Sequence, residues 1–141
     1  IRFSNLMQYL DTHNDWDVFQ GVIADVGNVE IQNVEECNEE TIVYLNHMVS
    51  MVFNYYKSHM FDRVISWDET DASQLTNTID RALESKDLKV VTTVPFLVGH
   101  KEDLKSTIWG FENTEYADWI LRSSEKLQKL VNDFKEGEKH D

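Results

Sequence analysis

The sequence contains one cysteine and one proline, and it has no long hydrophobic run. A lone cysteine, Cys37, cannot form a disulfide within the chain, which excludes a secreted scaffold built on disulfides. The apolar runs are short and interrupted, as in residues 90–98, so none is long enough to cross a bilayer. No signal peptide is visible. We therefore expect a cytoplasmic protein without direct membrane insertion. Since the chain begins at Ile1, we expect it to be excised from a longer protein.

Basic residues are also few. The chain has 13 Lys and Arg against 26 Asp and Glu, a net charge of −13. Residues 1–56 hold one base and nine acids, a net of −8, and residues 57–141 hold 12 bases and 17 acids, a net of −5. Such a surface repels nucleic acid phosphates. It suits a basic protein partner or a cation, although solubility alone also explains an acidic surface.

The hydrophobic content of 41% over 141 residues predicts one domain with a packed core. Apolar spacing predicts a helix over residues 1–10. Two regions stay ambiguous from local pattern: residues 18–25 fit a helix or a buried strand, and residues 38–60 fit one long helix or a strand over 41–45 followed by a helix.

The second half is clearer. Residues 63–67 (RVISW) form a short β-branched run that predicts a strand, and residues 71–86 have helical spacing. Residues 90–98 predict a second strand. Strand, helix and strand in succession indicate a βαβ unit with parallel strands. Residues 124–134 predict the last helix, and a charged tail follows.

An acidic residue, Asp68, follows the strand predicted over residues 63–67. Open parallel sheets place their ligand sites at the carboxyl ends of the strands. Asp68 is therefore a candidate for chemistry, although an acid at this position can also simply start a turn or cap the next helix.

Several segments together resemble the response-regulator receiver domain of two-component signalling. Residues 61–68 (FDRVISWD) resemble the family's third strand with its phosphorylated Asp, and residues 94–98 (VPFLV) resemble its fourth. Residues 108–112 and 117–122 (IWGFE, then ADWILR) resemble the stretch leading into its fifth strand. Residues 22–25 (VIAD) are similar to the first strand and its acidic end. The resemblance spans about residues 18–136 and favours strands over 18–25 and 41–45.

The resemblance implies a flavodoxin-like α/β fold, a doubly wound five-stranded parallel sheet of order 2-1-3-4-5 with an extra N-terminal helix. It divides the chain into an N-terminal extension or linker over residues 1–14, a receiver-like domain over 15–137 and a tail over 138–141. The resemblance implies a phosphoacceptor domain of a hybrid histidine kinase or of a regulator, and no independent enzyme is expected.

The family's chemistry assigns roles to individual residues. Asp68 would accept a phosphoryl group from a phosphohistidine, with Mg²⁺ held by Asp25 and Asp68. Arg122 would pair with the phosphate in place of Lys, which changes the donor geometry. His100 falls near the position of a Ser or Thr, and Trp119 takes the aromatic place. The implied partner is a histidine kinase or a histidine phosphotransfer domain, and a homodimer is possible.

The chain departs from the receiver pattern in its single acid at Asp25 and in lacking a hydroxyl near His100. Two alternatives therefore stay open: a receiver-like interaction module that is not phosphorylated, and an acidic binding or inhibitor protein without catalysis. A second resemblance is weaker. Residues 94–104 (VPFLVGHKEDL) resemble the guanine-recognition strand of Ras-like GTPases, but the chain has no GxxxxGK[ST] loop.

Three His–Asp pairs are close in sequence, but none has a third ligand nearby, and each is interpreted as a surface pair rather than a metal site. They are His13 with Asp17, His59 with Asp62, and His100 with Asp103. Cys37 has no local base and is interpreted as structural.

Overall fold

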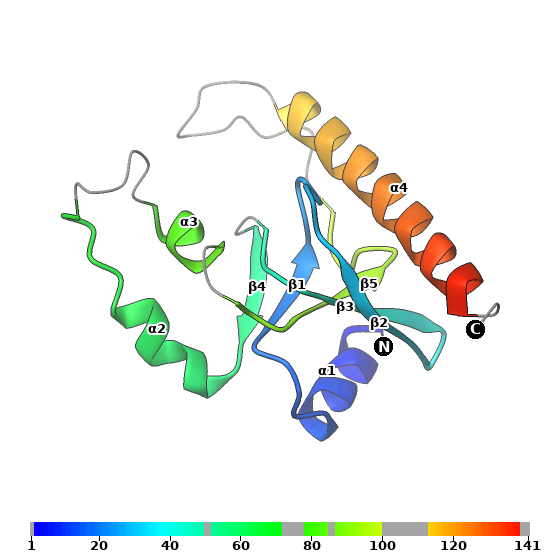
Figure 1. Ribbon diagram of the computed structural model, residues 1–141, viewed down its shortest axis with the longest axis horizontal. Helices are drawn as coiled ribbons and strands as arrows, with labels where there is room; N and C mark the ends of the chain where they lie inside the picture. Colours follow the sequence, from blue (N-terminus) through cyan, green and yellow to red (C-terminus); the bar gives the residue numbers. More distant parts are fainter. Residues whose placement is uncertain (1, 50–51, 72–77, 85–86, 100–112, 139–141) are drawn as a thin grey trace.

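The computed structural model describes residues 2–49, 52–71, 78–84, 87–99 and 113–138. In these ranges the chain forms four α-helices, one short 3-10 helix and five strands (Figure 1). In chain order they are α1 (Arg2–Thr12), β1 (Val18–Val22), β2 (Ile31–Cys37), β3 (Glu40–Leu45), β4 (Phe53–Tyr56), η1 (Ser58–Met60), α2 (Phe61–Ile65), α3 (Ile79–Glu84), β5 (Val90–Val94) and α4 (Asn113–Glu138).

The five strands form one mixed sheet of order β2-β3-β5-β1-β4. Only β1 and β5 are parallel, and the pairs β2–β3, β3–β5 and β1–β4 are antiparallel. The expectation of a flavodoxin-like parallel sheet of order 2-1-3-4-5 is therefore wrong. The two strands predicted over residues 18–25 and 41–45 do exist, but they are separated in the sheet by β5.

A tight hairpin explains why β2 and β3 are antiparallel. Cys37 pairs with Glu40, so only two residues connect the strands. Those residues, Asn38 and Glu39, both have positive φ, 49° and 69°. Two central residues with positive φ are typical of a type I′ turn, whose twist matches that of an antiparallel ribbon. A parallel connection needs a crossover of a dozen or more residues, which this loop excludes.

The predicted strand over residues 63–67 is also wrong, because residues 61–65 form α2. Short apolar runs do not distinguish a strand from a helix turn. The side chain of Ile65 is 78% exposed, so the run does not form a buried strand. Similarly, residues 117–122 lie within α4 and not at the start of a fifth strand.

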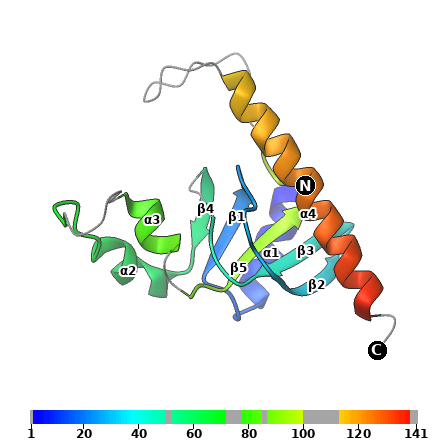
Figure 2. The ribbon, with the colours of Figure 1, turned by 45° about the horizontal axis from the view of Figure 1, so that its top comes forward.

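Helices cover both faces of the sheet (Figures 1 and 2). The adjacent residues Val90 and Val91 of β5 point to opposite faces and belong to two different core clusters. On the Val91 side, α1 packs through buried Leu6 and Leu10. On the Val90 side, α4 packs through Leu127 and Val131, with α3 joining that core.

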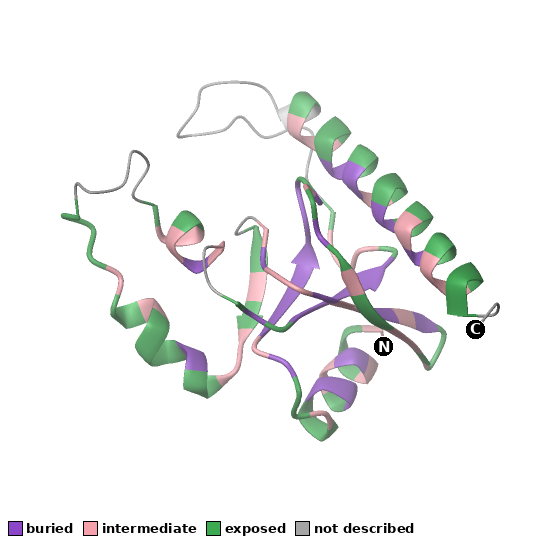
Figure 3. Ribbon diagram, viewed as in Figure 1, coloured by how far each residue is buried: buried purple, intermediate pink, exposed green. Residues whose placement is uncertain are grey.

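The two parallel strands form the centre of the molecule, and every residue of β1 and β5 is buried (Figure 3). The edge strands β2 and β4 are only partly buried. Among the described residues, no helix is long and apolar enough to span a membrane.

Candidate functional site

Asp68 lies in a turn after α2 and is exposed. Its Oδ1 accepts hydrogen bonds from the backbone N–H of Thr70 at 2.9 Å and from the Thr70 hydroxyl at 2.6 Å. These bonds lower the pKa of the Asp68 carboxyl below its usual range, with the hydroxyl as the larger cause. Asp68 is therefore an ionised, accessible carboxylate, but it is not at the end of a strand.

Asp25 and Arg122, in contrast, are brought together. Asp25 follows the end of β1, Arg122 lies on α4, and both line a pocket between β1, α3 and α4, which we call the α3–α4 pocket. Asp68 is not among its lining residues, and α2 lies well away from α4 in both views (Figures 1 and 2). His100 lies outside the described residues.

The α3–α4 pocket has a volume of about 560 Å³ and is partly open to solvent. Its lining combines acids, bases and aromatic rings: Ala24, Asp25, Val49, Asp80, Arg81, Glu84, Tyr116, Trp119, Arg122, Ser123 and Lys126. The α4 members recur every three or four residues, which places them on one face of the helix. The sequence interpretation missed this stripe because it expected a strand near residues 117–122.

Some charges of the α3–α4 pocket are already engaged. Arg81 Nη1 donates to Glu84 Oε2 at 2.7 Å, and Lys126 Nζ donates to the Gly27 carbonyl at 2.5 Å. Asp25 Oδ1 accepts the Gly27 N–H at 2.8 Å, which closes a turn at a glycine with φ of 55°. Arg122 makes no hydrogen bond or ion pair with any residue that the structure describes.

Two aromatic rings form one wall. The ring centroids of Tyr116 and Trp119 lie 5.9 Å apart with an interplanar angle of 56°. Burial and the charge of Asp80 raise the pKa of the Tyr116 phenol, so Tyr116 is neutral at pH 7. Trp119 is 49% exposed, which is unusual for so large an apolar side chain.

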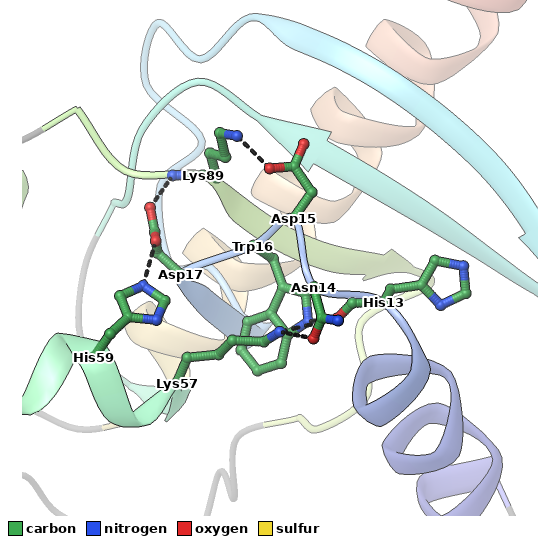
Figure 4. A network of polar contacts seen from close by, with 8 residues as sticks. All are labelled: His13, Asn14, Asp15, Trp16, Asp17, Lys57, His59 and Lys89. Atoms are coloured by element: carbon green, nitrogen blue, oxygen red, sulfur yellow. Dashed lines mark hydrogen bonds and ion pairs between the residues drawn. The ribbon is translucent and has the colours of Figure 1, made fainter.

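A second polar region lies at the opposite ends of β1 and β5, where both strands begin (Figure 4). Asp17 is its centre. His59 Nε2 lies 2.7 Å from Asp17 Oδ1, and the backbone N–H of Lys89 donates to Asp17 Oδ2 at 2.8 Å. The Lys89 ammonium pairs with Asp15. The sequence suggested Asp17 with His13 and His59 with Asp62 as surface pairs, whereas the structure places His59 beside Asp17. Asp17 thereby links the start of β1 to η1, which contains His59, and to Lys89 at the start of β5.

Lys57 fixes the chain segment before β1. Its Nζ donates to the His13 carbonyl and to Asn14 Oδ1, both at 3.0 Å, and lies 4.8 Å from the centre of the Trp16 ring. Trp16 Nε1 also donates to the His13 carbonyl, at 2.8 Å. These contacts hold residues 13–17 in one conformation.

Beside this segment is a smaller recess of about 330 Å³, which we call the acidic recess. Its lining is mostly polar: His13, Asn14, Asp15, Gln32, Asn33, Glu35, Tyr44, Leu45 and Lys89. The register of β2 and β3 pairs Asn33 with Tyr44, so Glu35 lies diagonally across from Tyr44 on the same face. The sequence interpretation did not identify β2 as a strand and therefore missed this group.

A chain of hydrogen bonds orients Glu35. The Tyr9 hydroxyl donates to Glu35 Oε2 at 2.6 Å, and the Asn33 amide donates to Oε1 at 2.9 Å. The Tyr9 and Tyr44 hydroxyl oxygens lie 2.5 Å apart. Since the single Tyr9 proton goes to Glu35, the Tyr44 hydroxyl donates to Tyr9. Burial first, and then the charges of Glu35 and Asp15, raise the pKa of Tyr44.

The implied Mg²⁺ site is not supported by the residues assigned to it. Asp25 and Asp68 belong to different parts of the molecule. Among the described residues, no group of three His, Cys, Asp or Glu side chains is placed to hold a metal ion.

Comparison with known proteins adds no relative. No family model matches the chain, no curated protein matches it, and no solved structure matches it. The resemblance to receiver domains therefore stays a prediction from sequence.

Proposed function

We propose that this protein is a non-catalytic recognition module that binds a basic partner protein, with an arginine side chain of the partner in the acidic recess. The environment of the Glu35 carboxylate supports this proposal. The carboxylate is partly buried and held by two neutral donors, Tyr9 and Asn33, and it pairs with no cation among the described residues.

The charges around the recess favour a cation. Asp15 and Glu35 are acidic, and the only base in the lining is Lys89, which already pairs with Asp15. With His13 neutral, the lining has a net charge of −1, located on Glu35. The whole chain has a net charge of −13, which would attract a basic partner from a distance and speed association.

The arrangement of acceptors in the acidic recess favours a guanidinium over an ammonium group as the bound cation. A guanidinium is planar, offers five donors and is weakly hydrated, so it suits a partly buried carboxylate beside an aromatic ring. The Tyr44 hydroxyl donates to Tyr9, which leaves its own lone pairs free to accept a hydrogen bond. Glu35 and the Tyr44 oxygen thus provide two acceptors on one face of the β2–β3 hairpin.

Binding of an arginine-rich peptide tests the proposal. We would titrate the protein with a short peptide containing three arginines, and with a matched peptide containing lysines, by isothermal calorimetry. We expect tighter binding of the arginine peptide. Loss of one partner of a partly buried charge pair costs about 2 kcal/mol or more, so Glu35→Gln should weaken binding by at least about thirtyfold.

Glu69→Gln is the matched control, because Glu69 is an exposed acid after α2 and its substitution changes the net charge equally. We expect it to change affinity by less than about twofold at physiological salt. Equal losses from Glu35→Gln and Glu69→Gln would show that only overall charge attracts the peptide, and the recess would then have no specific role.

Phosphoryl transfer to Asp68 is a second hypothesis, and the exposed, ionised state of this carboxylate is what favours it. The test is the intact mass of the protein after incubation with acetyl phosphate and Mg²⁺. A gain of one phosphoryl group that disappears in Asp68→Asn would support a phosphoacceptor. No gain by the folded protein would remove this hypothesis and leave the recognition module.

A further inference from the structure

The α3–α4 pocket lies at the other end of β1 from the acidic recess and has a different chemistry. Its lining carries three acids and three bases, so it is neutral as a whole. The pair Arg81 and Glu84 is closed on itself by a hydrogen bond of 2.7 Å. The remaining charges are therefore the ones that a ligand would meet.

These remaining charges are of both signs. Within the described ranges, Arg122 has no ion-pair partner and Lys126 donates only to a backbone carbonyl. Of the two remaining acids, Asp25 accepts one backbone N–H through Oδ1. The negative charge of Asp80 contributes to the raised pKa of the Tyr116 phenol. A ligand with one positive and one negative group would complement both sides, whereas a simple anion or cation would meet repulsion from one of them.

The aromatic wall adds an apolar surface. Trp119 is about half exposed and lies in contact with Tyr116, while Val49 and Ala24 contribute further apolar atoms to the lining. Exposed aromatic surface inside a pocket favours a flat or bulky apolar ligand group. The volume of about 560 Å³ is within the range of about 300–1,000 Å³ that small-molecule sites occupy.

A serine hydroxyl provides an unusual feature. Ser123 lies between Trp119 and Lys126 on α4 and is 95% buried, and its Oγ has no hydrogen-bond partner in the part of the chain that the structure describes. A helical serine ordinarily donates to the carbonyl one turn earlier, and a buried hydroxyl without a partner is rare. Rotation about one side-chain bond is the smallest change that would offer this hydroxyl to a ligand carboxylate beside Arg122.

We propose that the α3–α4 pocket binds a free amino acid with an aromatic side chain, as the zwitterion. Arg122 and the Ser123 hydroxyl bind the carboxylate, Asp25 and Asp80 bind the ammonium group, and Trp119 with Tyr116 contacts the ring. This site is separate from the acidic recess and does not depend on recognition of a basic protein.

The probe for this proposal is L-phenylalanine, followed by calorimetry and by the NMR signals of the tryptophan indoles. Three analogues each lack one element: 3-phenylpropionate lacks the ammonium group, phenethylamine lacks the carboxylate, and L-alanine lacks the ring. We expect L-phenylalanine to bind at least about tenfold more tightly than any of the three. Binding should shift the Trp119 indole signal.

Two variants assign the charges. Arg122→Gln should weaken L-phenylalanine and 3-phenylpropionate by about tenfold and leave phenethylamine unchanged. Asp25→Asn keeps an oxygen to accept the Gly27 N–H and should weaken L-phenylalanine and phenethylamine but not 3-phenylpropionate. Arg63→Gln and Asp62→Asn, two exposed residues of α2, are the matched controls, and neither should change binding.

Ser123→Ala separates ligand binding from packing. It should raise the melting temperature of the free protein, because it removes a buried hydroxyl without a partner, and it should weaken L-phenylalanine. Absence of L-phenylalanine binding up to about 10 mM by the folded protein would overturn the proposal. Binding of any of the three analogues as tightly as L-phenylalanine, or L-phenylalanine binding unaffected by Arg122→Gln, would overturn it as well.

Discussion

The ring of Phe53 on β4 lies directly against Gly21 on β1. A Cβ placed on Gly21 would overlap the Phe53 ring, with Cε1 at 3.0 Å and Cγ at 3.2 Å and Cδ1 closer still. The register between β1 and β4 shifts at this point, between Gln20 and Val22. The Phe53 ring thus occupies the space that a side chain at position 21 would need.

Gly21→Ala should therefore destabilise the protein. The added methyl group displaces the Phe53 ring or separates the two strands, and overpacking of this kind costs about 1–3 kcal/mol. Urea denaturation gives the measurement. Gly137→Ala is the matched control, because a Cβ at Gly137 meets no atom within 4 Å and alanine favours a helix. A Gly21→Ala protein as stable as the Gly137→Ala protein would contradict the close contact.

The sequence predicted the elements with strong apolar periodicity. The helices over residues 1–10 and 124–134 correspond to α1 and to part of α4, and the strand over 90–98 corresponds to β5. The strand over 41–45 corresponds to β3, but local pattern left it ambiguous and only the receiver resemblance favoured it. These segments are buried on at least one face, so their patterns of apolar residues are clear. β2 was missed because an edge strand with polar residues such as Gln32 and Asn33 has little apolar alternation.

The sheet topology could not be predicted from local pattern. The parallel interpretation depended on a strand over residues 63–67, and a five-residue apolar run is too short to exclude a helix turn. The candidate site was predicted in part. Asp25 and Arg122 meet in one pocket, but the partners that complete it, Trp119 and Ser123, lie on a helix where a strand was expected.

The hydroxyl chain from Glu35 to Tyr44 should make the protein less stable at alkaline pH. The pKa of Tyr9 is raised by burial first and then by the hydrogen bond that its hydroxyl donates to Glu35, and the pKa of Tyr44 is raised by burial. The folded protein therefore holds these protons more tightly than the unfolded chain. Their contribution to stability is complete below the usual tyrosine pKa of about 10 and is lost as the pH rises above it.

Tyr9→Phe isolates this effect. It removes the donor to Glu35 and the acceptor of the Tyr44 hydroxyl, which should lower the free energy of unfolding by about 1–2 kcal/mol at neutral pH. The variant should also lose less stability than the native protein between about pH 9 and pH 11. Urea denaturation at several pH values gives both results, and parallel curves for the two proteins would contradict the assignment.

The ion pair between Glu36 and Lys135 links β2 to the end of α4. The hydrogen bond from Lys135 lowers the pKa of the Glu36 carboxyl, with a smaller contribution from the Thr41 hydroxyl. The stability it provides is present above the ordinary glutamate pKa and is lost as the pH falls through the lowered value in the folded protein. Because both side chains are more than a third exposed, we expect less than about 1 kcal/mol.

Lys135→Met tests this link. It should reduce stability slightly at neutral pH and leave it unchanged at a pH where Glu36 is protonated. Thermal melts at neutral and at acidic pH provide the measurement. Repeating them at low and high salt checks the ion pair, since salt screens exposed pairs. A loss of stability that persists at acidic pH would indicate that the packing of the Lys135 stem matters more than its charge.

Packing of α1 against the sheet should contribute strongly to stability. Leu10 is fully buried, in a cluster with Phe19 and Val91, whereas Leu121 on α4 is 58% exposed. Leu10→Ala should cost about 2–5 kcal/mol and Leu121→Ala less than about 0.5 kcal/mol. Chemical denaturation compares the two. Similar small losses would show that α1 is an appendage and not part of the core.

The position of β5 has a consequence for how the chain assembles. In the sheet, the β2–β3 hairpin and the antiparallel pair β1–β4 are joined by backbone pairing only through this late strand, which pairs with β3 on one side and β1 on the other. During synthesis the ribosome must release more than 90 residues before the halves can join, and until then each exposes an open edge that can pair with another chain. A fragment ending before β5, mixed with a peptide of that strand, should therefore behave as a complementation pair.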